Sequence, residues 1–428
     1  MKSRNRKGVF SVICCCIAVW WSGAIAFGYP GVMTPYWQEA FGVGSAATGL
    51  VVTFMLLALA ICMFISGKVN AKYGMRVCVT CGLVFSVLAM IILLNAKNIY
   101  TVYVWAFVNN VGLSFMFGPG TAICQQWFPN RRGLVTGVLN MVFGGSAAVM
   151  SPIWNNMLAN MGYRKLNIIL LIMIVITDLI ALIACEGPSR TKLTPEEKKA
   201  HEELLASCAG KGKKGGMVAN YTLKEALSTK CFWLIWLSWV FMGAAGISMV
   251  SLSKSYSIAI GITGAIVLTS FNIANGVGRI ICGILCDAIG PAWTGVIAFV
   301  ICAGGYLALP HVSGVAGVAI CAICVGYGLA NLFATTPSLA SGIFGLKNFG
   351  TIFGVIWTAY GFIGGVVGPM LAGLVLDRTG NNYSIVFTYL AVFAVIGAVL
   401  YFILTKATVK EREKKLAEIA AAGGNKAA

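Results

Sequence analysis

The chain of 428 residues is 59% hydrophobic and only 10% charged, whereas soluble domains usually carry about 25% charged residues. Composition and length together exclude a single soluble domain, because soluble cores stop growing near about 250–300 residues. The formal net charge of +18 does not indicate a nucleic-acid partner, because the basic residues flank apolar runs and form no continuous basic stripe. The composition predicts a protein that crosses a membrane many times.

Twelve apolar runs reach the length of about 20 residues that a membrane-spanning helix needs. The first run follows a basic N-terminus and is too long for the apolar region of a cleaved signal peptide, so we interpret it as the first span. Between the sixth and seventh runs, TPEEKKAHEELL predicts a short amphipathic helix and GKGKKGG a flexible basic linker. The runs lie at roughly 9–36, 45–66, 77–95, 99–125, 133–160, 164–185, 231–254, 260–286, 292–310, 313–338, 350–375 and 382–405.

The distribution of the 31 Lys and Arg residues predicts the orientation of these spans. Most lie before the first run, in alternate loops, in the central segment and in the tail, and basic residues concentrate on the cytoplasmic side of membrane proteins. We therefore expect a multi-pass protein of the plasma (inner) membrane with both termini cytoplasmic. The few basic residues on the opposite side are Lys97, Arg164, Lys165, Lys254 and Arg378.

The two sets of six runs repeat one another. Gly67 and Gly74 recur 216 residues later as Gly283 and Gly290, at equivalent places between spans. Two six-helix halves joined by a cytoplasmic loop are the arrangement of the major facilitator superfamily, so we expect an all-α protein of twelve transmembrane helices in two pseudo-repeats. The expected parts are an N-terminal half at 1–186, a central loop at 187–229, a C-terminal half at 230–406 and a tail at 407–428.

Two loops resemble a signature of that superfamily. GKVNAKYGMR (residues 67–76) has the glycines that allow close helix packing, but Ala71 stands where the signature has an acid. The repeat-related GILCDAIG (residues 283–290) keeps its acid as Asp287. The resemblance implies that these loops control gating between the halves, through Gly67, Gly74, Arg76, Asp287 and Gly290.

Two further segments indicate which families within that superfamily the chain resembles. WFPNRRGLVTG (residues 127–137) and TLKEALSTKCFWLIW (residues 222–236) resemble the monocarboxylate transporters and the bacterial oxalate/formate antiporter family. The stretch VWWSGAIAFGYPG (residues 19–31) lacks the acidic, aromatic signature of many animal monocarboxylate transporters, so the bacterial branch fits better. The chain is similar to a bacterial lactate-transporter-like member of this family.

Arg279 is the strongest candidate for a substrate-binding residue. Placing an arginine in the middle of a span costs about 2.5–3.5 kcal/mol, and Asn275 lies one helical turn away on the same face. A planar guanidinium suits bidentate binding of a carboxylate, and in the resembling families an arginine at this place binds the substrate. The alternative is a structural arginine neutralised by Asp178, the single acid that we place within a span.

The resemblance also limits the classes of substrate that we expect. Animal members often pair this arginine with an aspartate where Asn275 stands, and dicarboxylate exchangers add a lysine where Ile356 or Trp357 falls here. One arginine without a second cation favours a substrate with one carboxylate, because an uncompensated charge is costly in a low-dielectric cavity. Lactate and pyruvate fit this description.

The other candidates are polar or aromatic residues at helical spacing within spans. Tyr29 belongs to a Gly-Tyr-Pro break in the first span, and broken helices often occur at transport sites. Asp178 is a weak candidate for proton coupling, and a helix-packing role is favoured for it. His201 and His311 are expected to be solvated loop residues. The candidate substrate-binding residues are Arg279, Asn275, Tyr327, Asn331, Phe117, Asn140, Tyr29 and Tyr360.

We therefore expect a secondary active transporter of a small monocarboxylate, L-lactate or pyruvate, by proton symport with alternating access. The alternatives are a monocarboxylate or formate/oxalate-type anion exchanger and, more remotely, a transporter-like sensor. An enzyme is not expected, because the two histidines lie in loops and a single acid in a span makes no catalytic constellation. We expect no cofactor, no metal and no nucleic-acid partner, with the lipid bilayer as surroundings and a monomer as the functional unit.

Overall fold

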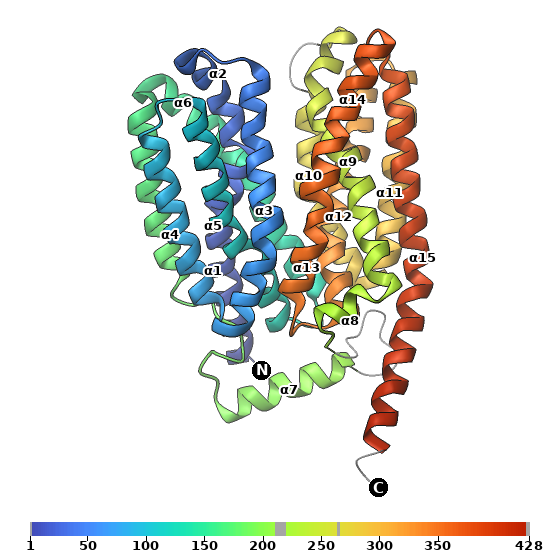
Figure 1. Ribbon diagram of the computed structural model, residues 1–428. Helices are drawn as coiled ribbons and strands as arrows, with labels where there is room; N and C mark the ends of the chain where they lie inside the picture. Colours follow the sequence, from blue (N-terminus) through green and yellow to red (C-terminus); the bar gives the residue numbers. More distant parts are fainter. Residues whose placement is uncertain (1, 210–219, 263–265, 425–428) are drawn as a thin grey trace. The chain divides into compact units, whose positions relative to one another are not determined.

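The computed structural model describes residues 2–209, 220–262 and 266–424. Within these ranges all regular structure is helical (Figure 1), which confirms the predicted all-α class. The helices are α1 Lys2–Phe27, α2 Tyr29–Phe41, α3 Ser45–Tyr73, α4 Met75–Leu94, α5 Ile99–Trp127, α6 Arg132–Ala181, α7 Pro195–Ala209, α8 Leu223–Leu227, α9 Lys230–Ala259, α10 Ile266–Ile289, α11 Pro291–Ala308, η1 Leu309–His311, α12 Val315–Phe344, α13 Phe349–Thr358, η2 Ala359–Gly364, α14 Gly365–Thr379 and α15 Tyr383–Gly424.

Among the described residues, ten helices are long and apolar enough to cross a membrane. Of the two remaining predicted spans, 133–160 lies within α6, and 164–185 begins in α6 and extends four residues beyond its end at Ala181. This helix is interrupted at Gly162, whose φ of 76° and ψ of 169° are values that a residue with a Cβ rarely adopts. Gly162 therefore divides α6 into two arms, and the predicted total of twelve spans requires each arm to cross the membrane.

The chain forms two compact units. Unit 1 comprises Met1–Pro129, Val138–Glu203 and Phe353–Val355, and unit 2 comprises Asn130–Gly137, Leu204–Ile352 and Ile356–Ala428. Each unit therefore includes a short piece of the other half of the sequence. The beginning of α6 belongs to unit 2, and one turn of α13 belongs to unit 1.

These two exchanged pieces make equivalent close helix contacts. A Cβ added to Gly137 would lie 2.5 Å from the carbonyl oxygen of Arg279 in unit 2, and a Cβ added to Gly354 would lie 2.5 Å from the backbone nitrogen of Phe64 in unit 1. Gly354 is 217 residues after Gly137, the spacing of the internal repeat to within one residue. In both units, a glycine lets one helix cross another at backbone distance, as small residues commonly do in membrane proteins.

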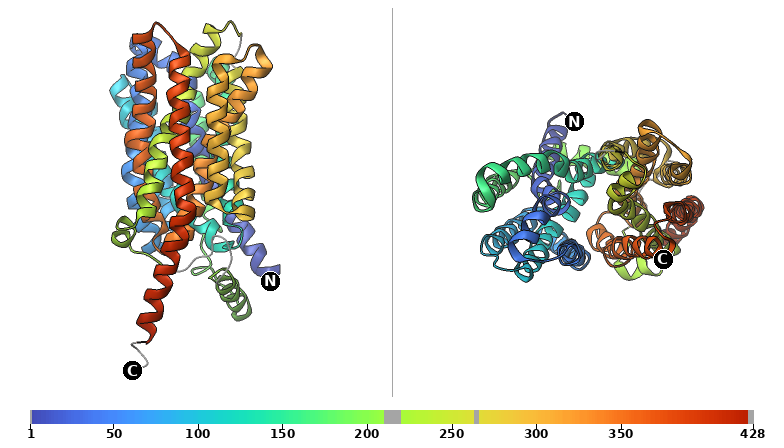
Figure 2. Two further views of the ribbon diagram at one scale, coloured as in Figure 1. Left: turned by 90° about the vertical axis from the view of Figure 1, so that its right-hand side faces the viewer. Right: turned by 90° about the horizontal axis from the view of Figure 1, so that it is seen from above.

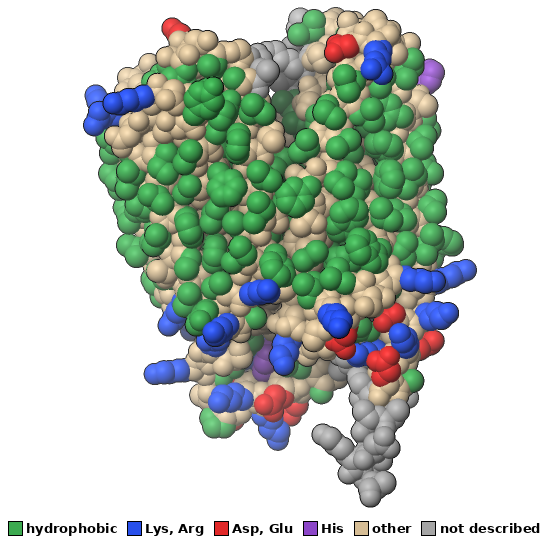
Figure 3. All heavy atoms as spheres, viewed as in Figure 1, with side chains coloured by type: hydrophobic (Ala, Val, Ile, Leu, Met, Phe, Trp, Pro, Cys, Tyr) green, Lys and Arg blue, Asp and Glu red, His purple; other side chains and the backbone are tan. Residues whose placement is uncertain are grey.

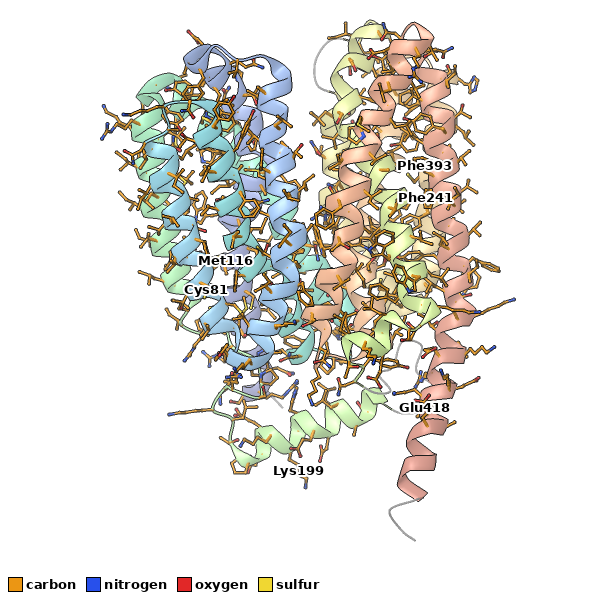
Figure 4. The ribbon with its side chains drawn as sticks, viewed as in Figure 1. Cys81, Met116, Lys199, Phe241, Phe393 and Glu418 are labelled. Atoms are coloured by element: carbon orange, nitrogen blue, oxygen red, sulfur yellow. The ribbon has the colours of Figure 1, made fainter. Side chains whose placement is uncertain are left out.

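Side-chain packing holds the helices of each unit together. In unit 1, Met116 of α5 fills the space above Gly82 of α4, where an added Cβ would meet its Cε at 2.6 Å; Figure 4 labels Met116 and the neighbouring Cys81. In unit 2, the rings of Phe241 and Phe393 pack edge to face with centroids 5.4 Å apart (Figure 4). Such an aromatic pair contributes about 0.5–1.5 kcal/mol.

The surfaces of the units suit a bilayer. In each unit, hydrophobic side chains cover the middle of the face shown in Figure 3, and most of the Lys and Arg side chains visible there lie toward its lower end. At that end of unit 2, α15 continues well beyond the neighbouring helices (Figures 1 and 2). We refer to this end of unit 2, where α15 extends, as its basic end.

The predicted amphipathic helix of the central loop is confirmed as α7, while the predicted linker GKGKKGG lies outside the described residues. Glu197 of α7 accepts hydrogen bonds from Lys7 and Ser3 of α1, each at 2.7 Å. Arg4 Nη2 lies 2.8 Å from His201 Nδ1. His201, predicted to be a solvated loop residue, is half-buried and contacts Arg4, because the amphipathic loop helix folds back onto the N-terminus. His311 is exposed, as predicted.

Candidate functional site

Arg279 lies in the middle of α10 with only 1% of its surface exposed. Its Nη2 donates a hydrogen bond to Oδ1 of Asn275, one turn earlier, at 3.3 Å. The guanidinium carbon also lies 4.6 Å from the centroid of the Phe333 ring on α12. The predicted pairing of Arg279 with Asn275 on one helix face is thus present, and Phe333 is an additional neighbour.

Glycines fix the backbone of α10 on both sides of this arginine. An added Cβ on Gly278 would lie 2.9 Å from Ala330 and 3.1 Å from the Tyr327 ring of α12, and Gly137 of α6 packs directly on the backbone of Arg279. Two closely packed neighbours leave α10 little freedom to rotate or slide, because packed interiors respond to even small changes of volume. The helix therefore holds the guanidinium in a defined place.

An aromatic cluster surrounds Phe333. Its ring centroid lies 5.4 Å from that of Trp239 on α9, 5.6 Å from that of Trp357 on α13 and 5.7 Å from that of Tyr360 on η2. Trp239, Trp357 and Tyr360 are each at most 1% exposed. Of this cluster, the sequence predicted only Tyr360 as a substrate-binding residue, because aromatic side chains inside apolar runs carry no signal that separates a site from a core.

Tyr360 is positioned by an irregular helix. The helix η2 has π-helical hydrogen bonding between two α-helical stretches, and such insertions often occur at functional sites. Gly243 of α9 accommodates the tyrosine, since an added Cβ there would lie 2.8 Å from its Cδ2. The glycines around Tyr360 were the one available sequence signal for this irregularity.

The two predicted substrate-binding residues of α12, Asn331 and Tyr327, differ from each other in their burial. Asn331 is fully buried, and both atoms of its amide lack a hydrogen-bond partner within the part of the chain that the structure describes. Buried amides are almost always bonded to protein or to water, so Asn331 has free capacity for a ligand. Tyr327 is half-buried against Gly278. Their contact with substrate remains a prediction.

In unit 1, Tyr29 lies in the core. It is fully buried, its hydroxyl donates to Asn167 Oδ1 at 2.5 Å, and its ring lies among Trp37, Trp105 and Trp154. The predicted break before it is confirmed, since α2 begins at Tyr29. A substrate contact for Tyr29 stays a prediction.

Two more predicted residues of unit 1 are also inside the helix bundle. Phe117 of α5 stacks on Phe143 of α6 with ring centroids 4.3 Å apart. Asn140 of α6 is fully buried. Both belong to membrane-spanning helices, and their role in binding remains a prediction.

Asp178 is a buried acid in the second arm of α6. Its side chain is 1% exposed, and its Oδ1 has no hydrogen-bond partner among the described residues. No basic side chain within the described ranges forms a salt bridge with it. A helix-packing role would normally include an interhelical hydrogen bond, and Oδ1 makes none.

The first predicted gating loop is anchored by an acid that the sequence analysis did not single out. Glu186 accepts hydrogen bonds from the backbone nitrogens of Met75, at 3.1 Å, and Arg76, at 3.5 Å. Gly74 adopts a φ of 91°, and an added Cβ would lie 2.9 Å from Glu186 Oε1. Glu186 thus caps the start of α4, which is a favourable place for a negative charge.

In the second predicted gating loop, residues 283–290, the acid of the signature is Asp287. Asp287 accepts hydrogen bonds from the backbone nitrogens of Gly133 and Leu134, both at 2.9 Å. These nitrogens belong to the first turn of α6, so Asp287 caps that helix. Gly290, with a φ of 91°, forms the turn into α11. Gly67 lies within α3.

Within the described ranges, no group of three or more His, Cys, Asp or Glu side chains could hold a metal ion.

Comparison with known proteins places this arrangement in a family. The model of the Major Facilitator Superfamily matches residues 13–366 and, separately, residues 247–425. The Escherichia coli fucose:proton symporter, a solved structure, superposes with a TM-score of 0.68 over 92% of this chain and 98% of its own, at 15% sequence identity. That likeness concerns the fold.

Three curated proteins resemble the chain in sequence. The MFS-type transporter YhjX of Escherichia coli is 26% identical over 76% of each chain. The oxalate:formate antiporter of Oxalobacter formigenes is 22% identical over 70% of this chain and 68% of its own. Monocarboxylate transporter 4 of Gallus gallus is 23% identical over 86% of this chain and 79% of its own. Two of these names concern carboxylate transport.

Proposed function

The chain belongs to the Major Facilitator Superfamily, and we propose that it is a secondary active transporter of a small monocarboxylate, L-lactate or pyruvate, driven by proton symport. The named activities of two relatives, an oxalate:formate antiporter and a monocarboxylate transporter, support carboxylates as the substrate class. In this proposal, residues 1–186 and 230–406 are the halves that rock to give alternating access, and both termini face the cytoplasm at the inner membrane.

The observation that carries the proposal is the buried guanidinium of Arg279. It lies in a membrane-spanning helix beside a neutral amide, Asn275, and an aromatic face, Phe333. Neither of these two neighbours carries a negative charge, and guanidinium groups make fork-like hydrogen bonds with carboxylates. In the proposed complex, the amide of Asn331 binds the hydroxyl or keto oxygen of the substrate.

The surroundings of Arg279 favour one carboxylate over two. Trp357, one of the two positions where the resembling dicarboxylate exchangers would have a lysine, packs in the aromatic cluster around Phe333. A dicarboxylate would place its second charge against indole and phenyl rings, and unpaired charges are costly there. A monocarboxylate would place a methyl or methylene group against the same rings.

Proton symport has an energetic advantage. Moving one elementary charge across the membrane potential costs or releases about 2.3 kcal/mol per 100 mV, and an anion that crosses with a proton avoids this term. Asp178 is the proposed proton carrier, because its carboxyl is buried and its Oδ1 makes no hydrogen bond among the described residues.

Anion exchange is the second candidate, and one observation favours it. The position one turn before Arg279, which is acidic in many proton-coupled members, is Asn275 here. An exchanger needs only an arginine that must be occupied before the halves move. The oxalate:formate antiporter exemplifies this class.

Uptake of labelled L-lactate into proteoliposomes distinguishes the two mechanisms. Accumulation above equilibrium only with an inward proton gradient supports symport. Uptake only into vesicles preloaded with another carboxylate contradicts symport and supports exchange. Asp178→Asn should abolish gradient-driven accumulation and leave exchange intact if Asp178 carries the proton; Asp377→Asn, at an exposed acid of α14, is the matched control.

A further inference from the structure

A cavity of about 250 Å³ lies at the basic end of unit 2. Its walls come from the start of α11, the end of α12 and the stretch of α15 between Thr405 and Lys415. Arg279 and its aromatic neighbours are not among the lining residues. The cavity is therefore separate from the proposed transport site.

One polar group inside this cavity has unused bonding capacity. The Ser338 side chain is 5% exposed, and its hydroxyl oxygen has no hydrogen-bond partner within the described part of the chain. The first turn of α11, at residues 290–293, forms another wall, and among the described residues no side chain caps this helix end. A hydroxyl and the positive end of a helix together favour an anionic oxygen.

Cationic side chains lie at the same place. Arg412 lines the cavity, and a neighbouring hollow of about 700 Å³ shares Tyr221, Glu411 and Lys415 with it. That hollow is lined by five lysines and three glutamates, which gives a net charge of +2. The surroundings of the cavity thus attract an anion.

The acids near the cavity are already engaged. Glu411 accepts a hydrogen bond from the hydroxyl of Tyr221 at 3.1 Å. Lys415 forms salt bridges with Glu225, at 3.1 Å, and Glu418, at 3.2 Å, the latter labelled in Figure 4. These contacts hold the extension of α15 against the α8 region. Arg412, on the same stretch of α15, adds a further cationic side chain to the cavity wall.

Apolar side chains of the same cavity face the surroundings of the protein. Trp293 is 45% exposed and Val409 is 54% exposed, and both line the cavity. In a membrane protein, exposed apolar side chains near the basic end of a span lie against lipid, and tryptophan is enriched at that depth. The cavity therefore joins an anion-attracting interior to a lipid-facing rim.

We propose that this cavity binds the phosphate of an anionic phospholipid from the leaflet at the basic end. The phosphate oxygens accept hydrogen bonds from the Ser338 hydroxyl and Arg412 and face the first turn of α11. The acyl chains pass Trp293 and Val409 into the bilayer. Basic pockets between helices on the cytoplasmic side are known places for lipid headgroups in general, and a soluble phosphate compound would share the same headgroup chemistry.

The test is a lipid titration of the full-length protein in detergent, read from the midpoint of thermal unfolding. A ligand that binds the folded state raises this midpoint in a saturable way. Phosphatidylglycerol should do so, and phosphatidylcholine should not. Glycerol 3-phosphate distinguishes the two phosphate sources: a saturable shift by this soluble compound as large as that by phosphatidylglycerol would overturn the lipid assignment.

Variants of residues that line the cavity test whether phosphatidylglycerol binds there. Arg412→Gln should weaken the apparent affinity for phosphatidylglycerol at least tenfold, and Ser338→Ala about threefold to tenfold, while Arg412→Lys should retain most of it. The matched controls are Lys406→Gln, at an exposed lysine of α15, and Ser251→Ala, at an exposed serine of α9, both expected within twofold of the wild type. The affinity comes from the concentration dependence, so a lower starting midpoint does not affect the comparison. Equal binding of both lipids, or unchanged affinity in Arg412→Gln and Ser338→Ala, would overturn the proposal.

Discussion

The guanidinium carbon of Arg279 lies 4.6 Å from the centroid of the Phe333 ring. A cation over an aromatic face is stabilised by about 2 kcal/mol when it is desolvated, and the ring carries no net negative charge. Phe333 therefore helps α10 to carry a buried cation and still allows that cation to bind an anion. The position of Phe333 in α12 therefore bears directly on the proposed binding of a carboxylate by Arg279.

Replacing Phe333 should weaken substrate binding. Phe333→Leu keeps an apolar side chain of similar size but removes the aromatic face, so we expect the apparent affinity for lactate to fall about fivefold to tenfold. Phe333→Tyr keeps the face and should stay within about twofold. The concentration dependence of initial uptake measures both. Equal affinities in the leucine variant and the wild type would show that the ring contributes only packing.

Changes at Arg279 should be more severe. Arg279→Gln removes the charge and should reduce uptake by a hundredfold or more, since charge-assisted hydrogen bonds contribute about 1.5–3 kcal/mol each. Arg279→Lys keeps the charge but loses the planar fork, and we expect at least a tenfold loss. Arg378→Gln, at an exposed arginine of α14, is the control. Normal transport by Arg279→Lys would contradict the bidentate contact.

Asp287 should stabilise unit 2 through the start of α6. Its carboxylate accepts two backbone hydrogen bonds there, and the loss of such a cap costs about 0.5–2 kcal/mol. Asp287→Ala should therefore lower the midpoint of thermal unfolding, and Asp287→Asn, which retains one accepting oxygen, should lower it less. An unchanged midpoint in the alanine variant would mean that the cap contributes nothing to stability.

The contact between α7 and the N-terminus should depend on pH through His201. Burial, and secondarily the charge of Arg4, lower the pKa of His201 from 6.5 to about 4. The detached helix therefore binds more protons than the docked helix between these values, so the docked state loses stability as the pH falls from about 6.5 toward 4. Protonation of Nδ1 would also remove the acceptor for Arg4.

Hydrogen exchange of the α7 amides, corrected for the intrinsic effect of pH, measures this dependence. We expect protection to decrease by up to about tenfold per pH unit below 6.5. His201→Gln should abolish the decrease. Glu197 should contribute mainly below pH 4.5, because hydrogen bonds from Lys7, Ser3 and Thr194 lower its pKa from 4.5 in the detached helix to about 2 in the docked helix. A wild-type protection factor that does not change between pH 7 and pH 5 would rule out this role of His201.

The sequence predicted those parts of the structure that depend on the contrast between apolar and charged residues. Long apolar runs predicted the helices, and Arg279 stood out because a charge inside a span is expensive. The paired glycines predicted the repeat, and Gly137 and Gly354 indeed make equivalent close contacts in the two units. Asp287 was recognisable because it stands in a motif with defined spacing.

The sequence did not predict relationships that arise only from packing. Phe333 and Trp357 are aromatic residues in apolar runs, and the same residue types fill the core around Tyr29. His201 lies in a polar segment, so its burial against Arg4 follows from the folding of α7 and from no local pattern. Glu186 caps α4 from a residue more than a hundred positions away in the chain, and single-sequence reasoning has no means to find such a contact.

Direct binding measurements test the central claim, that Arg279 binds the carboxylate of the substrate. The dissociation constants of L-lactate and of lactamide, its neutral amide of nearly the same shape, should be compared in the wild type and in Arg279→Gln. We predict that the wild type binds lactate at least thirtyfold more tightly than lactamide and that the variant binds the two equally. A wild type that does not distinguish lactate from lactamide, or a variant that keeps the full preference, would contradict the account.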